Sequence, residues 1–345
     1  MSENIPDSGR GDLNPSELSA LETYMRAAGI EAIGPIRADL LSGGKSNLTF
    51  ALSDGASRWT YRRPPYTGLT PSAHDVGREF HITDCLMGTS VPVPRAVLRC
   101  DDPDVLGAPF IITEFVEGRV LRTEDDLADL TDPELSACTG ELLSVLVELH
   151  GVDPDGVGLG NLSRRGDYMH RQFQRWSAQW ELVRNESSPD IEPLRRALAK
   201  QLPEDSASTI THGDYRIDNA IFAGDTSRIL AVLDWELAAL GDPLADLAMM
   251  CMYRSRPLDL ILGVRAAWTS DRLPRPSELA ETYARLSGRD LRNWTAYMAF
   301  ANFKLAVVAQ GIVHRARLDA DRADEAIRVQ AAVPQFIDQG MSEIS

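Results

Sequence analysis

Cysteine is scarce in this chain, and its four cysteines are scattered. Cys85, Cys100, Cys138 and Cys251 form no CxxC pair and have no histidine at metal-ligand spacing, so neither a disulfide framework nor a zinc site is expected. No apolar run approaches the roughly 20 residues that cross a bilayer. Residues 1–13 are polar and acidic, without the apolar segment of a secretory signal. We therefore expect a cytoplasmic protein with free thiols, a disordered N-terminal tail and no membrane partner.

Basic residues are also in deficit. The 345 residues include 35 Lys and Arg against 51 Asp and Glu, a formal net charge of -16. Nucleic-acid phosphates are bound by clustered Lys and Arg, so no nucleic-acid partner is expected. The acidity could attract a cationic substrate, but an ordinary soluble surface has the same composition, and we favour that interpretation.

The order of the expected elements indicates an α+β chain with two lobes. Asn14 and Pro15 are typical of a helix start and Gly29 of a helix end. Asp54 and Gly55 predict a hairpin between two strands. Strands are expected within 36–61 and at 96–100 and 110–115, and helices at 16–28, within 71–87, and at 131–150, 166–185, 191–201, 277–287 and 291–318. We divide the chain into a tail with one helix, a small antiparallel lobe and a larger, mainly helical lobe: residues 1–29, 30–117 and 118–345.

The strongest chemical signal is the segment HGDYRIDN, residues 212–219, followed fifteen residues after Asn219 by Asp234 in LAVLDWE. Phosphoryl transfer needs a carboxylate that accepts the proton of the attacking hydroxyl, and oxygen ligands that hold magnesium against the phosphates. Asp214 can be that carboxylate. Asn219, five residues on, can reach the same site from one loop, and Asp234 supplies a hard anionic ligand.

These motifs resemble the aminoglycoside phosphotransferase and choline-kinase-like superfamily, whose fold is that of protein kinases. HGDYRIDN keeps the Asp-x-x-x-x-Asn spacing of the kinase catalytic loop, LDWE stands where kinases carry Asp-Phe-Gly, and GDPLADLA is a further marker. The resemblance covers about residues 30–330. It implies that Asp214 is the catalytic base, that Asn219 and Asp234 bind Mg²⁺, and that ATP is the phosphate donor, with GTP left open.

The small lobe is expected to bind the nucleotide. The resemblance implies that Gly43, Gly44, Lys45, Ser46 and Asn47 form the glycine-rich loop over the phosphates, where small residues let backbone N–H groups approach.

The kinase lysine and its helix glutamate correspond to Arg62 and Glu79, with Arg63 as the alternative by strand register. One of these two arginines is expected on a surface face, because neighbouring strand residues point oppositely. FIITEFVEG resembles the hinge, where backbone groups near Glu114 and Val116 would bond to adenine.

Other polar and aromatic residues receive structural roles. We expect Asp242 and Asp246 to hydrogen-bond the catalytic-loop backbone, and we assign no chemistry to the histidines outside that loop. An aromatic stripe recurs at helical spacing, and we favour core packing over a wall of the acceptor pocket: Tyr168, Phe173, Trp176 and Trp180.

Within the superfamily, the chain is similar to relatives of the kinase-like N-terminal domain of bifunctional acyl-CoA dehydrogenases, through RRPP, VPVPRAV and GAPFIITEFVEG. This implies a small-molecule acceptor with a hydroxyl, a metabolite such as a hydroxyacyl thioester, and weakens the interpretation as an antibiotic-resistance enzyme. The alternative is a nucleotide-binding pseudokinase, disfavoured because Asp214, Asn219 and Asp234 are all present. The acceptor and the oligomeric state, homodimer included, stay open.

Overall fold

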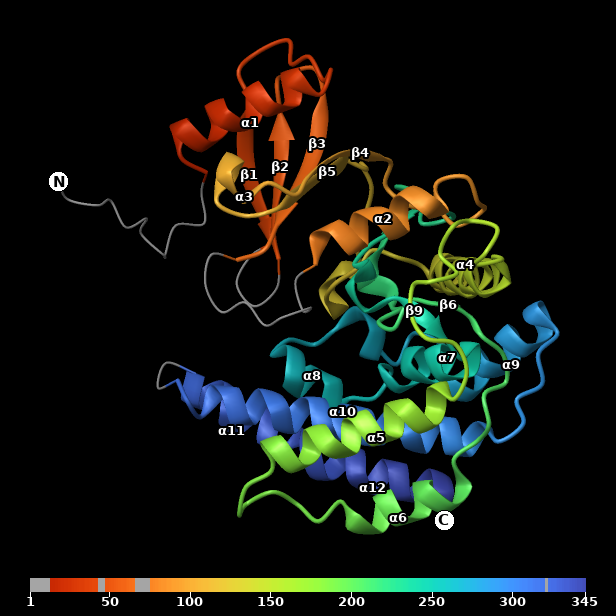
Figure 1. Ribbon diagram of the computed structural model, residues 1–345. Helices are drawn as coiled ribbons and strands as arrows, with labels where there is room; N and C mark the ends of the chain where they lie inside the picture. Colours follow the sequence, from red (N-terminus) through yellow and green to blue (C-terminus); the bar gives the residue numbers. More distant parts are fainter. Residues whose placement is uncertain (1–12, 43–46, 66–74, 320–321) are drawn as a thin grey trace. The chain divides into compact units, whose positions relative to one another are not determined.

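The computed structural model describes residues 13–42, 47–65, 75–319 and 322–345 (Figure 1). The chain divides into two compact units, Met1–Glu117 with Ala231–Glu236, and Gly118–Leu230 with Leu237–Ser345. The predicted large lobe includes residues 231–236, whereas the contacts of Ala231–Glu236 place them with the first unit.

The first unit contains a five-stranded sheet in the order β1-β2-β3-β5-β4, with antiparallel neighbours throughout. The hairpin between β2 and β3 forms because the Asp54 side chain accepts hydrogen bonds from the backbone N–H groups of Ala56 and Ser57 at 2.9 and 2.6 Å. The strands are β1 (Arg37–Ser42), β2 (Leu48–Ser53), β3 (Arg58–Arg63), β4 (Ala96–Cys100) and β5 (Phe110–Glu114), and the helices are α1 (Pro15–Ala27), α2 (Val76–Leu86) and α3 (Pro103–Leu106).

Helix α1 begins where the sequence predicts. The Asn14 side chain accepts from the N–H of Glu17 at 3.0 Å, and the Glu17 carboxylate accepts from the N–H of Asn14 at 2.8 Å. This reciprocal cap satisfies N–H groups that a helix start otherwise leaves unpaired. The predicted helix within 71–87 is shorter: α2 begins after its N-cap, Asp75, and residues 66–74 lie outside the described part of the chain.

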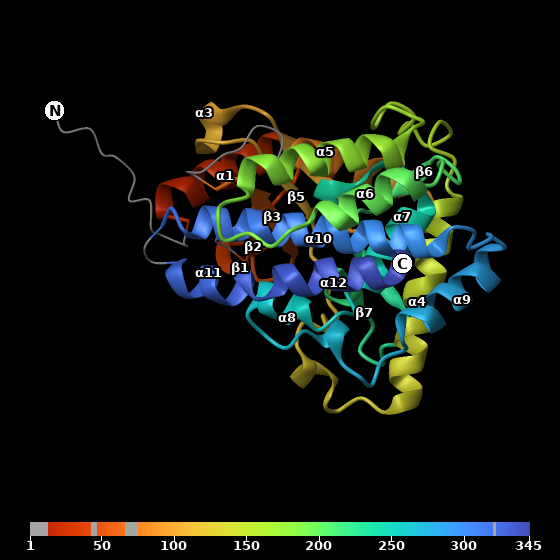
Figure 2. The same cartoon turned by 90° about the horizontal axis from the view of Figure 1, so that it is seen from below.

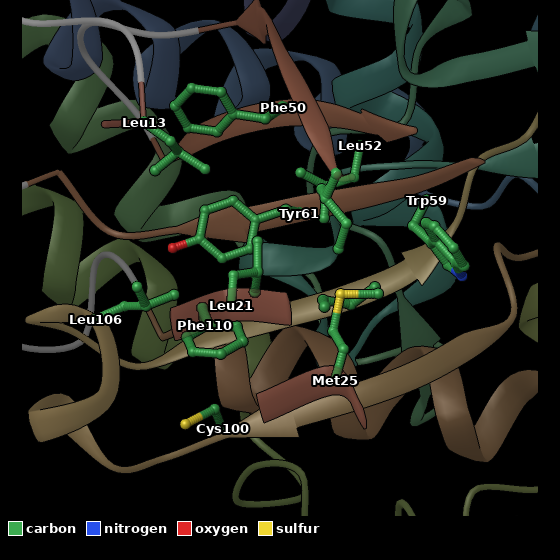
Figure 3. Close-up of a cluster of buried hydrophobic side chains, with 12 residues drawn as sticks. Leu13, Leu21, Met25, Phe50, Leu52, Trp59, Tyr61, Cys100, Leu106 and Phe110 are labelled. Atoms are coloured by element: carbon green, nitrogen blue, oxygen red, sulfur yellow. The ribbon is translucent and has the colours of Figure 1, made fainter. Parts of the chain in front are cut away.

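The core of the first unit lies between α1 and one face of the sheet (Figure 3). Leu21 and Met25 of α1 are fully buried beside Phe50, Tyr61 and Phe110. The Tyr61 and Phe110 ring centroids are 5.3 Å apart. Because side chains alternate along a strand, Tyr61 on this face puts its neighbour in β3, Arg62, on the other face.

The second unit is mainly helical, with two small two-stranded sheets, β6-β9 and β7-β8. Its helices are α4 (Asp132–Gly151), α5 (Tyr168–Val183), α6 (Glu192–Gln201), α7 (Pro243–Met252), α8 (Pro257–Leu262), α9 (Pro276–Ser287), α10 (Trp294–Ala316), α11 (Ala323–Gln330) and α12 (Ala332–Ile344). Its short strands are β6 (Thr209–Thr211), β7 (Ala220–Phe222), β8 (Ile229–Val232), whose end lies in the first unit, and β9 (Ala239–Gly241). The 3₁₀ helices are η1 (Glu124–Leu127), η2 (Ile217–Asn219), η3 (Trp235–Leu237), which begins in the first unit, and η4 (Ala267–Thr269).

Helix α10 organises this unit, with α5, α6 and α12 running beside it (Figure 2). Among the described residues it is the helix long and apolar enough to cross a membrane, yet 83% of that apolar window is buried inside the protein. A core helix passes the same test, so this is weak support for a membrane span. The helix expected at 291–318 is confirmed as α10, although Asn302, Lys304 and Gln310 interrupt its apolar run.

Candidate active site

The segment HGDYRIDN leaves β6 at Thr211 and ends in the 3₁₀ turn η2 (Ile217–Asn219). β6 is held by antiparallel pairing with β9, in the register Thr211 to Ala239 and Thr209 to Gly241. Both strands are only three residues long, so their pairing alone fixes little of the loop that follows. Side-chain contacts to the loop fix the remainder of its conformation.

Asp246 of α7 accepts hydrogen bonds from the backbone N–H groups of His212 and Gly213, both at 2.8 Å. The expected structural role of Asp246 is therefore confirmed. Asp242 behaves differently, because it caps α7 through the N–H of Leu244 at 2.8 Å and accepts from Tyr297 Oη at 2.9 Å. Asp242 thus ties α7 to α10, and our assignment of it to the loop backbone was wrong.

Gly213 is required at its position for two reasons. Its φ is +84°, in the left-handed region that residues with a Cβ adopt at a cost. A Cβ added there would lie 2.7 Å from the backbone oxygen of Leu237. The glycine therefore lets the loop turn tightly against the segment that leads into β9.

Asp214 is held by its neighbours in the loop. Its carboxylate forms an ion pair with Arg216 Nε at 3.3 Å and accepts from Asn219 Nδ2 at 3.0 Å. The same Asn219 amide donates to the backbone oxygen of Asp214 at 2.8 Å. The structure therefore brings together the predicted base and one predicted metal ligand, with the amide nitrogen of Asn219 turned toward Asp214.

Arg216 joins two carboxylates, since it also forms an ion pair with Asp218 at 3.0 Å. Burial alone would lower its pKa, but the charges of Asp214 and Asp218 outweigh burial and raise it. For Asp218 burial outweighs the attraction of Arg216, and the pKa of that carboxyl is raised. Arg216 therefore stays charged beside the base.

A buried network behind the loop was missed from the sequence. His150, at the end of α4, donates or accepts through Nε2 to Asp246 at 3.2 Å and through Nδ1 to Tyr283 at 2.6 Å. Burial would raise the pKa of Asp246, but the hydrogen bond and charge of His150 and the charge and N–H of His212 lower it. A histidine at the end of the mostly apolar stretch VLVELH was the available signal.

In the first unit, Arg62 of β3 forms ion pairs with Glu79 of α2 at 3.2 Å and with Asp234 at 2.7 Å. Burial lowers the pKa of Arg62, but the charges of Glu79 and Asp234 raise it overall. The pKa of Glu79 also rises, to about 7, because burial outweighs the attraction of Arg62. A raised pKa keeps Arg62 charged but favours the neutral form of Glu79. Arg62 is bonded more closely to Asp234, and Glu79 Oε2 is buried without a hydrogen-bond partner among the described residues.

Arg63 does not lie on a surface face, as we expected one of the two arginines to do. Its side chain is fully buried and donates from Nη1 to the backbone oxygen of Leu106 at 3.1 Å and from Nε to that of Pro64 at 3.3 Å. The two arginines point to opposite faces of β3: Arg63 is fully buried on the face that also carries Tyr61, where it meets α3, whereas the Arg62 side chain is 16% exposed on the other face. Arg62 is therefore the arginine that meets Glu79.

Asp234 follows β8 with a φ of +65°, a left-handed conformation that costs about 1 kcal/mol or more outside glycine. The turn is held by Trp235, whose Nε1 donates to the backbone oxygen of Val232 at 3.0 Å, and by Arg78 of α2, which donates to the backbone oxygen of Glu236 at 3.1 Å. Strain that the surroundings maintain in this way is typical of functional residues.

Asn47 stands at the end of the predicted glycine-rich loop. Its side chain is 3% exposed, and both Nδ2 and Oδ1 lack a hydrogen-bond partner within the described ranges. An unpaired buried amide is costly, which favours a ligand as its partner. Gly43, Gly44, Lys45 and Ser46 lie outside the described residues.

At the predicted hinge, the N–H of Glu114 donates to the backbone oxygen of Arg95 at 2.9 Å, so it is not available to a ligand. The Glu114 side chain is half exposed and pairs with Arg95 at 3.3 Å. For Val116, no backbone hydrogen bond is made within the described part of the chain. Of the two predicted positions, Val116 is the one whose backbone N–H has no partner among the described residues.

The two predicted metal ligands fit magnesium by their chemistry. Arg62 occupies one oxygen of Asp234, and the nitrogen of Asn219 turns toward Asp214, which leaves an oxygen on each side chain for a hard cation. Asn219 belongs to the second unit and Asp234 to the first. No group of three or more His, Cys, Asp or Glu residues within the described ranges forms a metal site.

A lobe with an antiparallel sheet, and a helical lobe whose loop carries Asp214 and Asn219, define a phosphotransferase with the protein-kinase-like fold. The chain belongs to the phosphotransferase enzyme family, whose family model matches residues 38–300. The resemblance that we drew from HGDYRIDN and LDWE is thereby confirmed.

The solved structure of a putative aminoglycoside phosphotransferase from Ralstonia eutropha is 31% identical, with a TM-score of 0.81 and coverage of 94% of this chain and 97% of that one. Aminoglycoside phosphotransferase APH(4)-Ia, in a ternary complex with AMP-PNP and hygromycin B, is 18% identical with a TM-score of 0.60, covering 93% and 99%. These likenesses confirm the predicted α+β, kinase-like fold.

Acyl-CoA dehydrogenase family member 10 of Mus musculus is 34% identical over 301 residues, which cover 86% of this chain and 28% of the relative. The chain thus spans less than a third of the length of this relative. The predicted similarity to bifunctional acyl-CoA dehydrogenases is confirmed as a similarity of sequence.

Proposed function

We propose that this phosphotransferase moves the γ-phosphoryl group of ATP, with Mg²⁺, onto a hydroxyl of a small molecule. The observation that carries the proposal is the Asp214 carboxylate held by both Arg216 and Asn219 on one rigid loop. A catalytic carboxylate must be oriented before it can accept a proton, and two partners from the same loop orient it. The family supports the reaction type, and the complex of APH(4)-Ia with AMP-PNP supports an adenine nucleotide as donor.

In the proposed reaction, Asp214 accepts the proton of the acceptor hydroxyl as the acceptor oxygen bonds to the γ-phosphorus. The bond from that phosphorus to the bridging oxygen breaks, ADP leaves with the electron pair, and Asp214 then releases its proton to solvent. Asn219 keeps the carboxylate aimed, and Asp246 holds the loop backbone beneath it. Mg²⁺, when bound by Asn219 and Asp234, would neutralise charge on the phosphates.

On the donor side, Arg62 and Asn47 are proposed to meet the nucleotide phosphates. Arg62 can donate to two phosphate oxygens while Glu79 restrains it, because its guanidinium is planar and always charged. The Asn47 side chain has no partner within the described residues and is buried where a ligand could satisfy it. Adenine is proposed to bond to the backbone near Val116, with Glu114 at the same hinge.

The acceptor is proposed to be a hydroxylated metabolite. Similarity to the acyl-CoA dehydrogenase relatives supports a hydroxyacyl thioester, and similarity to the aminoglycoside phosphotransferases supports an aminoglycoside-like alcohol. We propose a cytoplasmic enzyme without nucleic-acid or membrane partners, and GTP as donor and a homodimer remain open proposals. A nucleotide-binding pseudokinase is the second candidate, and intact Asp214, Asn219 and Asp234 argue against it.

The decisive experiment compares Asp214→Asn with wild type in a transfer assay from radiolabelled ATP to a panel of hydroxylated metabolites. Asp214→Asn should lower turnover about 100- to 10,000-fold, the range of general-base contributions, and leave nucleotide affinity unchanged. Asp225→Asn removes an exposed carboxylate of the same unit and should leave both unchanged. Nucleotide binding without transfer to any acceptor would favour the pseudokinase, and an unchanged rate in Asp214→Asn would remove the proposed base.

A further inference from the structure

Lys304 of α10 and Arg175 of α5 are among the cations of the helical unit that have no carboxylate partner within the described residues. We call these two the α5–α10 cationic pair. Within the described residues neither forms an ion pair, although the chain has 51 acidic residues against 35 basic ones. In so acidic a protein, a partly buried ammonium that meets no carboxylate needs an explanation.

Trp176 connects the two cations. Lys304 Nζ lies 5.6 Å from the centre of the Trp176 ring, and Arg175 Cζ lies 5.7 Å from it. α5 and α10 lie side by side (Figure 2), and the Phe173 and Phe303 rings, 5.7 Å apart, pack beside this contact. Gln172 accepts from Trp176 Nε1 at 3.1 Å and holds the indole in place. Packing thus keeps both cations close to the Trp176 ring.

The shifted pKa of Lys304 indicates that its ammonium lacks a nearby anion. Burial lowers the pKa of Lys304, the charges of Asp214 and Asp246 raise it in part, and the charge of Arg175 lowers it further. Arg175 therefore repels Lys304, whose ammonium is partly desolvated and lies within electrostatic reach of the proposed base. An anion between the two cations would relieve both the desolvation and the repulsion.

The aromatic stripe of α5 divides accordingly. Trp180 is buried, as core packing requires, whereas Trp176 is only partly buried and lies against Lys304 and Arg175. The alternative interpretation of the stripe as a wall of the acceptor pocket thus fits Trp176, and the favoured interpretation as core fits Trp180. Tyr253, at the end of α7, faces the Asp214 carboxylate. Burial and the charge of Asp214 raise the pKa of Tyr253.

We propose that the acceptor carries an anionic group, a carboxylate or a phosphate, which binds the α5–α10 cationic pair while the acceptor hydroxyl faces Asp214. The proposal rests on the proposed function and narrows its substrate class. A polycationic aminoglycoside would add a third positive charge beside Lys304 and Arg175, which disfavours it. Carboxylate and phosphate share the same recognition chemistry here, because both accept hydrogen bonds from ammonium and guanidinium groups.

The test uses the full chain and three matched probes: a straight-chain hydroxy acid, its neutral amide and its coenzyme A thioester. Binding is measured by calorimetry without nucleotide, and phosphate transfer is measured separately with ATP. We expect the amide to be the weakest ligand. Tighter binding of the free acid identifies a carboxylate, and tighter binding of the thioester identifies the phosphates of coenzyme A.

Lys304→Met keeps the length of the side chain and removes its charge. We expect it to weaken binding of the preferred anionic probe about tenfold or more, the value of one charge-assisted hydrogen bond, and to leave binding of the amide unchanged. Arg175→Gln should have a smaller effect, about two- to fivefold, because Arg175 is exposed. Lys200→Met, on an exposed position of α6, is the matched control and should change nothing.

Several outcomes would overturn the proposal: equal binding of acid, thioester and amide, an equal loss for charged and neutral probes in Lys304→Met, preferred use of an aminoglycoside, or no binding of any anionic probe. Thermal unfolding of Lys304→Met separates a folding defect from a binding defect, since removing an unpaired buried charge should not lower the melting temperature. Anion binding without phosphate transfer would contradict the proposed function alone, and transfer to neutral acceptors only would contradict the anionic acceptor alone.

Discussion

Glu79 makes a quantitative prediction about stability. Burial raises its pKa from 4.5 to about 7 in the folded chain. Between these pH values the folded chain holds a proton that the unfolded chain has released, so the free energy of unfolding falls as pH rises. A pKa difference of this size corresponds to about 3 kcal/mol across the window.

Glu79→Gln should remove this pH dependence, because a neutral amide resembles the protonated carboxyl at every pH. Wild type and variant should have similar unfolding free energies near pH 4, below both pKa values, and the variant should be more stable by about 3 kcal/mol near pH 8. Urea denaturation of both proteins at the two pH values measures the difference, in which other titrating groups cancel.

Glu117→Gln is the control, since the Glu117 side chain is 74% exposed in its ion pair with Arg58. It should show no such difference between the two pH values. If instead Glu79→Gln lost stability relative to wild type as pH rose, the attraction of Arg62 would exceed the cost of burying Glu79, and our reasoning about this pair would be wrong.

Four further changes test other parts of the molecule. Asp234→Ala should abolish the thermal shift that ATP with Mg²⁺ produces, and an unchanged shift with unchanged turnover would remove it from the metal site. Gly213→Ala should destabilise the chain by about 1–3 kcal/mol, measured by urea denaturation, and lower turnover, because its φ of +84° and the nearby backbone oxygen leave no room for a Cβ. Asp246→Asn should cost about 2–4 kcal/mol in the same measurement, since an amide nitrogen would face an N–H donor that Asp246 now satisfies. Arg63→Met should lower stability and leave the KM for ATP unchanged, and a larger kinetic defect than in Arg62→Ala would transfer the phosphate role to Arg63.

Several helices were predictable because their signals are local. Asn14 and Glu17 cap α1 as their spacing indicates, and Thr131 and Glu134 do the same for α4. α7 was missed although Asp242 and Pro243 mark its start, because all ten of its residues are buried and it therefore has no apolar and polar faces. α12 was missed because it follows α11 with almost no interruption and has a proline in its first turn.

The sequence alone determined the chemistry that is available: the spacing of Asp214 and Asn219 on one loop, the acidic residue after β8, and the membership of a phosphotransferase family. Such motifs are readable because a short loop restricts where its own side chains can go. The tertiary structure decided the environments. Burial, and contacts between residues distant in the sequence, raise the pKa of Glu79, bury Arg63 and bring Lys304 to Trp176, and no local pattern contains these contacts.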